Sequence, residues 1–313
     1  MKTIRSQSLD PTFNLSMEEY WLKHAVLDDD LFYLWRNNPA IVIGRNQNPY
    51  REIALWKAYQ DQVPVIRRIS GGGTVYHDPG NVNFTFVTSN FKGNINNYKA
   101  FLDPIEKALN QMGIPVRFQG KSDLYLGEKK VSGNAQSFHQ NRLIHHGTLL
   151  FDADLSKLSD YLHGKIPETT GPSVVSNRAS VGQIRPVWPK QGDVLDFCDD
   201  LFLAVEAGLN VTLETRRVEA FEIAAIAALA AEKYATFEWN YGETPPFSKR
   251  ILEPSGKWTA TLEIENGRID SVDSDWPEWM GLEGEKMDID ALRKRLRQLG
   301  VVDVEAFLAR IFD

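Results

Sequence analysis

The chain has little cysteine, no excess of positive charge and no long apolar run. Its one cysteine, Cys198, excludes an internal disulfide and any metal site built from several thiolates. The net charge of -7 argues against a protein that binds nucleic acid by neutralising phosphates over a broad surface. Apolar runs are short and the N-terminus lacks an apolar core of signal-peptide length, so we expect a cytoplasmic protein that binds neither membrane nor nucleic acid.

The composition is that of an ordinary globular protein. Hydrophobic residues make up 42% of the 313 residues and charged residues 25%, which is enough for a substantial core. This length favours one large domain plus a small one. We place the boundary in the Gly- and Pro-containing stretch 240–250, which predicts a catalytic domain over 1–245 and an accessory domain over 251–313.

The pattern of apolar and polar residues along the chain predicts an α/β (α+β) protein with a mixed sheet that has one buried face. A capping-box pattern at Ser16 and Glu19 predicts a helix over 14–26, and apolar spacing predicts one over 98–112 that Pro104 either starts or kinks. A hairpin is expected around Gly127, followed by an exposed loop. Asp154 is the expected N-cap of a helix over 155–162. Further strands are predicted at 31–35, 40–44, 63–70, 81–87 and 142–155, and further helices at 191–209 and 218–234.

The accessory domain is predicted as a small α+β module. Residues 258–264 alternate between polar and apolar, which predicts a strand, and Asn266-Gly267 is the dipeptide favoured in a type I′ turn. Residues 268–272 are predicted to form the second strand of this hairpin. Two short helices are expected near 288–299 and 303–312. The Pro-, Gly- and Ser-rich stretch 164–189 is a long irregular loop of the kind that is usually functional.

Three segments carry residues suited to chemistry on phosphates and carboxylates. The first is RRISGGGTVYHDPGN (67–81), where a strand ends in two arginines and runs into three glycines. Glycines let backbone N–H groups approach a phosphate, and the arginine fork suits phosphate oxygens, although such a run also marks ordinary turns. The second is GEKKVSGNA (127–135), whose lysines are either functional or two solvated hairpin residues. The third is HHGT (145–148); its two histidines point to opposite faces of a strand and cannot share one metal, so no direct metal cluster is expected.

Together these segments resemble the lipoate-protein ligase family in order, spacing and residue content. The resemblance extends to DPTFNLSMEE (10–19), LFYLWRNNPAIVIGRNQNP (31–49) and FEWNYGETPPFS (237–248). It covers 10–162 closely, continues more loosely to 250, and includes the C-terminal module in layout. It implies a catalytic domain with the fold shared by biotin- and lipoate-protein ligases, and an accessory domain that can reorient.

The resemblance implies an activity and a set of site residues. Such a ligase converts lipoate and ATP, with Mg²⁺, to lipoyl-AMP and pyrophosphate. It then transfers the lipoyl group to a lysine of lipoyl domains, those of 2-oxoacid dehydrogenase E2 subunits and the glycine cleavage H protein. Lys130 would be the catalytic lysine, touching the lipoate carboxyl and the α-phosphate. The ATP-binding set would be Arg68, Gly73, Thr74, Val75, Tyr76 and Lys130. The lipoate-binding set would be Lys130, Ser70, Gly71, Gly72, His77, Asn81, Ser132, Gly133, Ala135 and His146, and Asp123 would neighbour the metal or phosphate.

The chemistry explains why such residues are needed. A carboxylate attacks a phosphorus that itself carries negative charge, so cations and backbone donors must offset the repulsion. The mixed anhydride hydrolyses easily, which makes the stretch 164–189 a candidate lid that excludes water. The acyl tunnel should be apolar, and Trp35 and Val42 either line it or are plain core.

Two other functions remain open, and a third is less favoured. An octanoyltransferase of the same fold uses no ATP and acts through a cysteine, for which Cys198 is the one candidate, although its place in a helical stripe fits a structural thiol better. A lipoyl-AMP-binding protein would keep the pocket but need a partner for transfer. A biotin ligase would ordinarily show a GRGRRG-type loop, where this chain has RRISGGG.

Overall fold

The computed structural model describes residues 1–313 except 90–92, 94, 163–167, 178, 253–257 and 313. A large mixed sheet with strand order β12-β1-β2-β6-β10-β9-β8-β7 forms its centre. β1 pairs in parallel with β2 and β12, and the remaining neighbours are antiparallel. The strands are β1 (Lys2–Arg5), β2 (Leu31–Trp35), β6 (Asn81–Thr88), β7 (Val116–Gln119), β8 (Asp123–Leu126), β9 (Lys129–His139), β10 (Arg142–Leu150) and β12 (Glu214–Thr215).

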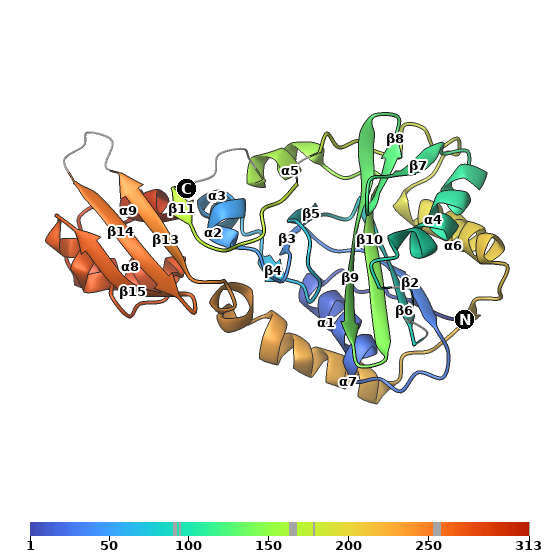
Figure 1. Cartoon of the computed structure of the whole chain (residues 1–313), viewed down its shortest axis with the longest axis horizontal. Helices are drawn as coiled ribbons and strands as arrows, with labels where there is room; N and C mark the ends of the chain where they lie inside the picture. Colours follow the sequence, from blue (N-terminus) through green and yellow to red (C-terminus); the bar gives the residue numbers. More distant parts are fainter. Residues whose placement is uncertain (90–92, 94, 163–167, 178, 253–257, 313) are drawn as a thin grey trace.

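Both faces of this sheet are covered, which corrects the expectation of a single buried face. Every residue of β6 is buried. Helices α4 (Tyr98–Gln111) and α6 (Val194–Leu209) pack on one face. The other face carries α1 (Pro11–Lys23) and a three-stranded sheet of order β4-β3-β5 (Figure 1). Its strands are β3 (Ala40–Ile43), β4 (Val65–Arg67) and β5 (Val75–His77), so the strand predicted over 63–70 is shorter.

Helix α1 begins three residues earlier than predicted. Asp10 is its N-cap and accepts hydrogen bonds from the backbone N–H groups of Thr12 and Phe13, with Pro11 in the first helical position. The Ser16 hydroxyl, predicted to be a cap, instead lies inside the helix and donates to the carbonyl of Thr12 at 2.7 Å. The capping-box pattern therefore misplaced the start of this helix.

The hairpin and the long helices follow the predicted order with altered bounds. The turn at Gly127 is present, but the predicted exposed loop after it is wrong because residues 129–139 continue as β9. Pro104 lies inside α4, and α6 begins at Val194. The helix predicted over 218–234 is α7 (Ala220–Leu229) followed by a π-helical turn, η1 (Ala230–Tyr234). Asp154 caps α5 (Leu155–Tyr161) as predicted.

A third sheet has strand order β11-β13-β14-β15. β11 (Thr169–Thr170) comes from the stretch 164–189, and the other three strands come from residues 247 onward. The stretch 240–250 is therefore not all connecting loop, because its last residues open a strand. Asn266 and Gly267 both have positive φ, 49° and 69°, as a type I′ turn requires. The remaining elements are β11 (Thr169–Thr170), β13 (Phe247–Leu252), β14 (Thr259–Glu265), β15 (Arg268–Ser274), α2 (Pro49–Glu52), α3 (Leu55–Gln60), η2 (Glu238–Gly242), η3 (Pro277–Leu282), α8 (Ile289–Gln298) and α9 (Val304–Phe312).

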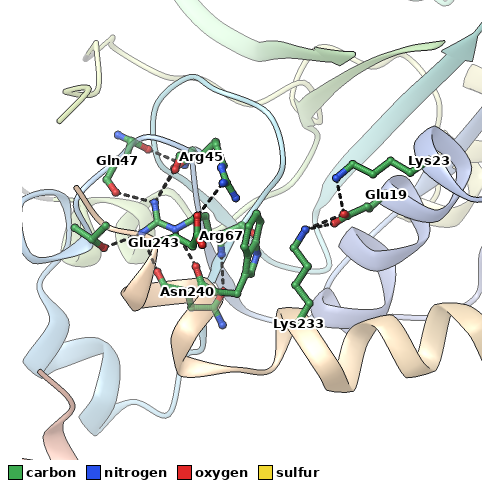
Figure 2. Close-up of polar contacts among 11 residues, drawn as sticks. Glu19, Lys23, Arg45, Gln47, Arg67, Lys233, Asn240 and Glu243 are labelled. Carbon is green, nitrogen blue, oxygen red and sulfur yellow. Dashed lines mark hydrogen bonds and ion pairs between the residues drawn. The ribbon is translucent and has the colours of Figure 1, made fainter. Parts of the chain in front are cut away.

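Arg67 links the turn η2 to the small sheet through hydrogen bonds. Its guanidinium is completely buried and donates to backbone carbonyls on both sides, among them Gln47 at 2.7 Å and Asn240 at 2.9 Å (Figure 2). Nearby, Glu19 of α1 accepts hydrogen bonds from Lys23 and Lys233. Arg67 thus has a structural role, and of the two adjacent arginines only Arg68 faces the cavity described below. Among the described residues, no helix is long and apolar enough to span a membrane.

Candidate active site

A cavity of about 310 Å³ lies on the face of the large sheet that α1 and the small sheet cover, and a second of about 660 Å³ adjoins it. The two share lining residues, including Thr74, Lys130 and Ser176. All three chemical motifs reach this region. The first cavity is lined by Arg68, Gly72, Gly73, Thr74, Val75, His77, Asp123, Lys130, Gly133, Ala135 and His146 of the predicted set. Tyr76 and Ser132 line the second.

Lys130 stands where the two cavities meet. It lies at the start of β9, and its ammonium is 3.0 Å from a carboxylate oxygen of Asp123 on the neighbouring strand β8. A Cβ at Gly133 would lie 3.1 Å from Lys130 Cε and 3.2 Å from Nζ, so the glycine leaves room for the lysine side chain. About a quarter of the Lys130 side chain is exposed, which leaves the ammonium accessible to a ligand.

Arg68 holds the glycine turn in shape from inside the protein. Its guanidinium donates to the carbonyls of Gly71 and Gly73 at 2.6 and 2.8 Å. It also donates to the Ser70 hydroxyl at 3.0 Å. Burial lowers the pKa of Arg68 to about 10, so the group stays charged at neutral pH. The backbone of Gly44 packs against the same turn, and a Cβ there would come within 2.2 Å of the Gly72 carbonyl oxygen.

The stretch predicted to be a lid contacts the glycine turn directly. The Ser176 hydroxyl accepts hydrogen bonds from the Thr74 backbone N–H and from the Gln47 amide, each at 3.0 Å. Gln47 is completely buried, and its carbonyl oxygen accepts from the Gly44 backbone N–H and the Thr74 hydroxyl. Residues 174–177 line the first cavity. Residues 164–167 and 178 of the same stretch lie outside the described part of the chain.

A buried polar chain runs behind the cavity from Ser70 to Trp35. The Ser70 hydroxyl is 2.6 Å from Nε2 of His146, whose Nδ1 is 2.8 Å from the carboxylate of Glu18. Thr85 donates to Glu18 at 2.7 Å and accepts from the Trp35 indole at 2.9 Å. Glu18 and Thr85 were not predicted as site residues, because nothing in a helical or alternating pattern marks a polar residue as buried.

The other predicted residues fall into two groups. Ser70, Gly71 and Asn81 do not line the first cavity, although Ser70 and Asn81 are buried beside residues that do. Trp35 and Val42 are core residues, 3% and 1% exposed, and they also line the cavity. Each is therefore both a core residue and a lining residue. Residues that line the first cavity but were not predicted as site residues are Leu15, Asn83, Ser122, Asn134, Gly147, Thr148 and residues 174–177.

His145 and His146 face opposite sides of the sheet, as their adjacency on a strand predicts. His146 lines the cavity, whereas His145 stacks on Phe101 at 4.8 Å between ring centroids, on the side of α4. Cys198 lies on α6, on that same far side, and packs against the core there. The sheet therefore separates Cys198 from Lys130. Among the described residues, no group of three or more His, Cys, Asp or Glu side chains could hold a metal ion.

Comparison with known proteins assigns the chain to a family. Residues 10–206 match the family model of the lipoyl protein ligase A/B catalytic domain. Lipoate-protein ligase 1 of Staphylococcus aureus is 33% identical over 282 residues, which are 86% of this chain and 83% of that one. The probable lipoate-protein ligase A of Mycoplasma genitalium is 32% identical over 99% of this chain and 98% of its own.

Solved structures agree on the fold of the larger part. A putative lipoate protein ligase of Thermoplasma acidophilum with bound lipoic acid has a TM-score of 0.67 at 21% identity, over 77% of this chain and 98% of that one. A lipoate-protein ligase A bound with ATP has a TM-score of 0.66 at 21% identity over the same shares. A structural study of the Thermoplasma acidophilum bipartite ligase and its E2 lipoyl domain gives 0.67 at 20% identity, over 77% and 96%. By its family model and its relatives, the chain belongs to the lipoate-protein ligase family.

Proposed function

We propose that this chain joins lipoate to ATP as lipoyl-AMP, releases pyrophosphate, and passes the lipoyl group to a lysine of a carrier domain. The observation that carries the proposal is the position of Lys130 where two cavities meet, next to the glycine turn. One cavity would take the acyl chain and the other the nucleotide. In the first step a lipoate oxygen bonds to the α-phosphorus and the bond to the pyrophosphate oxygen breaks.

Lys130 would touch both the carboxyl group and the α-phosphate. An ammonium there offsets the repulsion between two anions and stabilises the charge of the transition state. The glycine turn, shaped by Arg68, would supply backbone N–H groups from Gly73 to Tyr76 to the nucleotide phosphates. The remaining predicted lipoate-binding residues would line the acyl chain. In the second step the lysine amine attacks the lipoyl carbonyl carbon and AMP leaves.

Mg²⁺ fits this site as an ion carried by the phosphates. Asp123 is an acidic side chain that lines the first cavity, and its carboxylate is already paired with Lys130 at 3.0 Å. A single carboxylate plus substrate phosphates and water is a common way for Mg²⁺ to be held. When bound, the ion would reduce the negative charge that the attacking carboxylate meets.

The acceptors we propose are lipoyl domains, namely those of E2 subunits and the glycine cleavage H protein. A relative is named a lipoate-protein ligase, and the Thermoplasma acidophilum ligase was studied together with an E2 lipoyl domain. We also propose that residues 1–245 form the catalytic domain and 251–313 the accessory domain, in a cytoplasmic enzyme.

Separate assays of the half-reactions test the proposal. Exchange of labelled pyrophosphate into ATP should require lipoate, and transfer to an isolated lipoyl domain should then follow without another protein. Exchange without transfer would instead favour an adenylate-binding protein that needs a partner. Acyl transfer from an acyl carrier protein without ATP would favour the octanoyltransferase. Cys198→Ala should leave ligation unchanged, because the sheet separates this thiol from Lys130.

A further inference from the structure

The first cavity has a defined direction across the sheet. Ala135 of β9 pairs with His146 of β10, His146 pairs with Thr85 of β6, and Asn83 of β6 pairs with Trp35 of β2. From the β9 end with Lys130 to the β2 end with Trp35 there are three strand spacings, about 14 Å. An acid whose carboxyl group lies at Lys130 therefore extends its chain toward Trp35.

At the Trp35 end, the His77 ring has an N–H group for which the described residues supply no acceptor. The Asn14 amide nitrogen donates to three oxygens, one of them Asn37 Oδ1 at 2.9 Å. This contact turns the Asn37 amide nitrogen toward Nδ1 of His77, at 3.0 Å, so Nδ1 is an acceptor. Burial lowers the pKa of His77 to about 3, so the ring is neutral and its proton is on Nε2. Nε2 is buried and has no hydrogen-bond partner among the described residues.

Asn83 presents a second such donor. Its Oδ1 accepts from the Asn81 amide at 3.0 Å, which leaves its amide nitrogen as the available donor. This nitrogen is also buried without a partner among the described residues. His77 and Asn83 are 3% and 2% exposed, and both line the cavity beside Trp35. Two buried donors that have no partner among the described residues, both on residues lining the cavity, indicate that a group which accepts hydrogen bonds belongs there.

We propose that His77 and Asn83 select the acid by the atoms at the far end of its chain. This inference rests on the proposed function and names the feature of the substrate that the pocket recognises. The sulfur atoms of a dithiolane ring are weak acceptors and can take the two N–H groups. A chain that ends in an alkyl group leaves both donors buried and unsatisfied, which disfavours its binding. The pocket thus distinguishes lipoate from octanoate by sulfur and not by chain length.

A series of three acids tests this on the unmodified protein. Titration calorimetry without ATP or carrier compares lipoate, octanoate and 5-cyclopentylpentanoate, which keeps the five-membered ring but has carbon in place of sulfur. We expect lipoate to bind about tenfold more tightly than both others. Equal binding of lipoate and the carbocyclic acid would overturn the proposal, because ring shape would then account for any preference over octanoate.

Two variants locate the effect, and a third is the control. His77→Phe and Asn83→Leu remove one donor each with little change of volume, and each should reduce the preference for lipoate over the carbocyclic acid several-fold. His145→Phe is the matched control: His145 is also a buried histidine with Nε2 unpartnered among the described residues, but on the far face of the sheet. The preference should be unchanged there.

The result is independent of whether the protein is a ligase. Binding of free acids needs no adenylation, so a protein that shows the preference but no pyrophosphate exchange would refute the proposed function alone. Exchange with an unchanged acid preference in folded His77→Phe and Asn83→Leu would refute only the present inference. If neither variant folds, the three acids on the unmodified protein decide.

Discussion

Replacing Lys130 by alanine should remove catalysis and leave the fold intact. The ammonium is 3.0 Å from Asp123, but the two side chains are 24% and 22% exposed. A pair so accessible to water contributes about 1 kcal/mol or less to stability. Loss of one charged donor to a developing oxyanion costs about 3–4 kcal/mol of transition-state stabilisation, a factor of about 10²–10³ in rate. Activity and stability should therefore separate clearly.

Lys129 provides the matched control for this prediction. It is the preceding residue of β9, its side chain is exposed, and its ammonium donates to the Ser180 hydroxyl at 2.6 Å. Pyrophosphate exchange with lipoate, measured beside urea unfolding for both alanine variants, checks the expectation. Exchange should fall at least about a hundredfold in Lys130→Ala and change little in Lys129→Ala. Full exchange in folded Lys130→Ala would refute the assignment of Lys130.

Three further predictions follow from buried contacts. Gly44→Ala places a Cβ 2.2 Å from the Gly72 carbonyl oxygen, so the glycine turn must move and the KM for ATP in the exchange assay should rise; an unchanged KM would separate this turn from nucleotide binding. Arg67→Met leaves several buried carbonyls without a donor and should lower the free energy of unfolding in urea by about 3–5 kcal/mol. Arg45 pairs with Glu243, and the two side chains are 38% and 46% exposed. Arg45→Met should therefore lower the free energy of unfolding by about 1 kcal/mol or less. Because the pKa of His77 is lowered from 6.5 to about 3, unfolded chains bind a proton that the native state does not, and stability should fall as pH drops through this range. His77→Phe should flatten that part of the pH profile of urea unfolding, and an equally steep profile would contradict the buried, neutral ring.

Local patterns predicted most elements because their signals lie within a few residues of each other. The alternation in 258–264 and the turn at Asn266-Gly267 predicted the last hairpin correctly, and the helical spacing of 98–112 predicted α4. The start of α1 was wrong because two nearby residues, Asp10 and Ser16, could each cap a helix, and only the packed chain selects Asp10. The prediction of an exposed loop after the turn at Gly127 was also wrong. The small residues in GEKKVSGNA are compatible with a loop, but residues 129–139 form a strand because β8 and β10 pair with them.

Three motifs in order, rather than any one of them, predicted the family, and the resemblance they carry named Lys130 and the glycine turn. The sequence by itself determined which residue types were available, namely a hairpin with two lysines and two arginines before a run of three glycines. Tertiary structure alone decided that Arg67 is structural and that Arg68 shapes the turn. It also brought Glu18 and Thr85 behind His146, and left His77 and Asn83 with donors that have no partner in the described part of the chain. The physical reason is that burial and hydrogen-bond partners depend on residues distant in the chain, which no local pattern records.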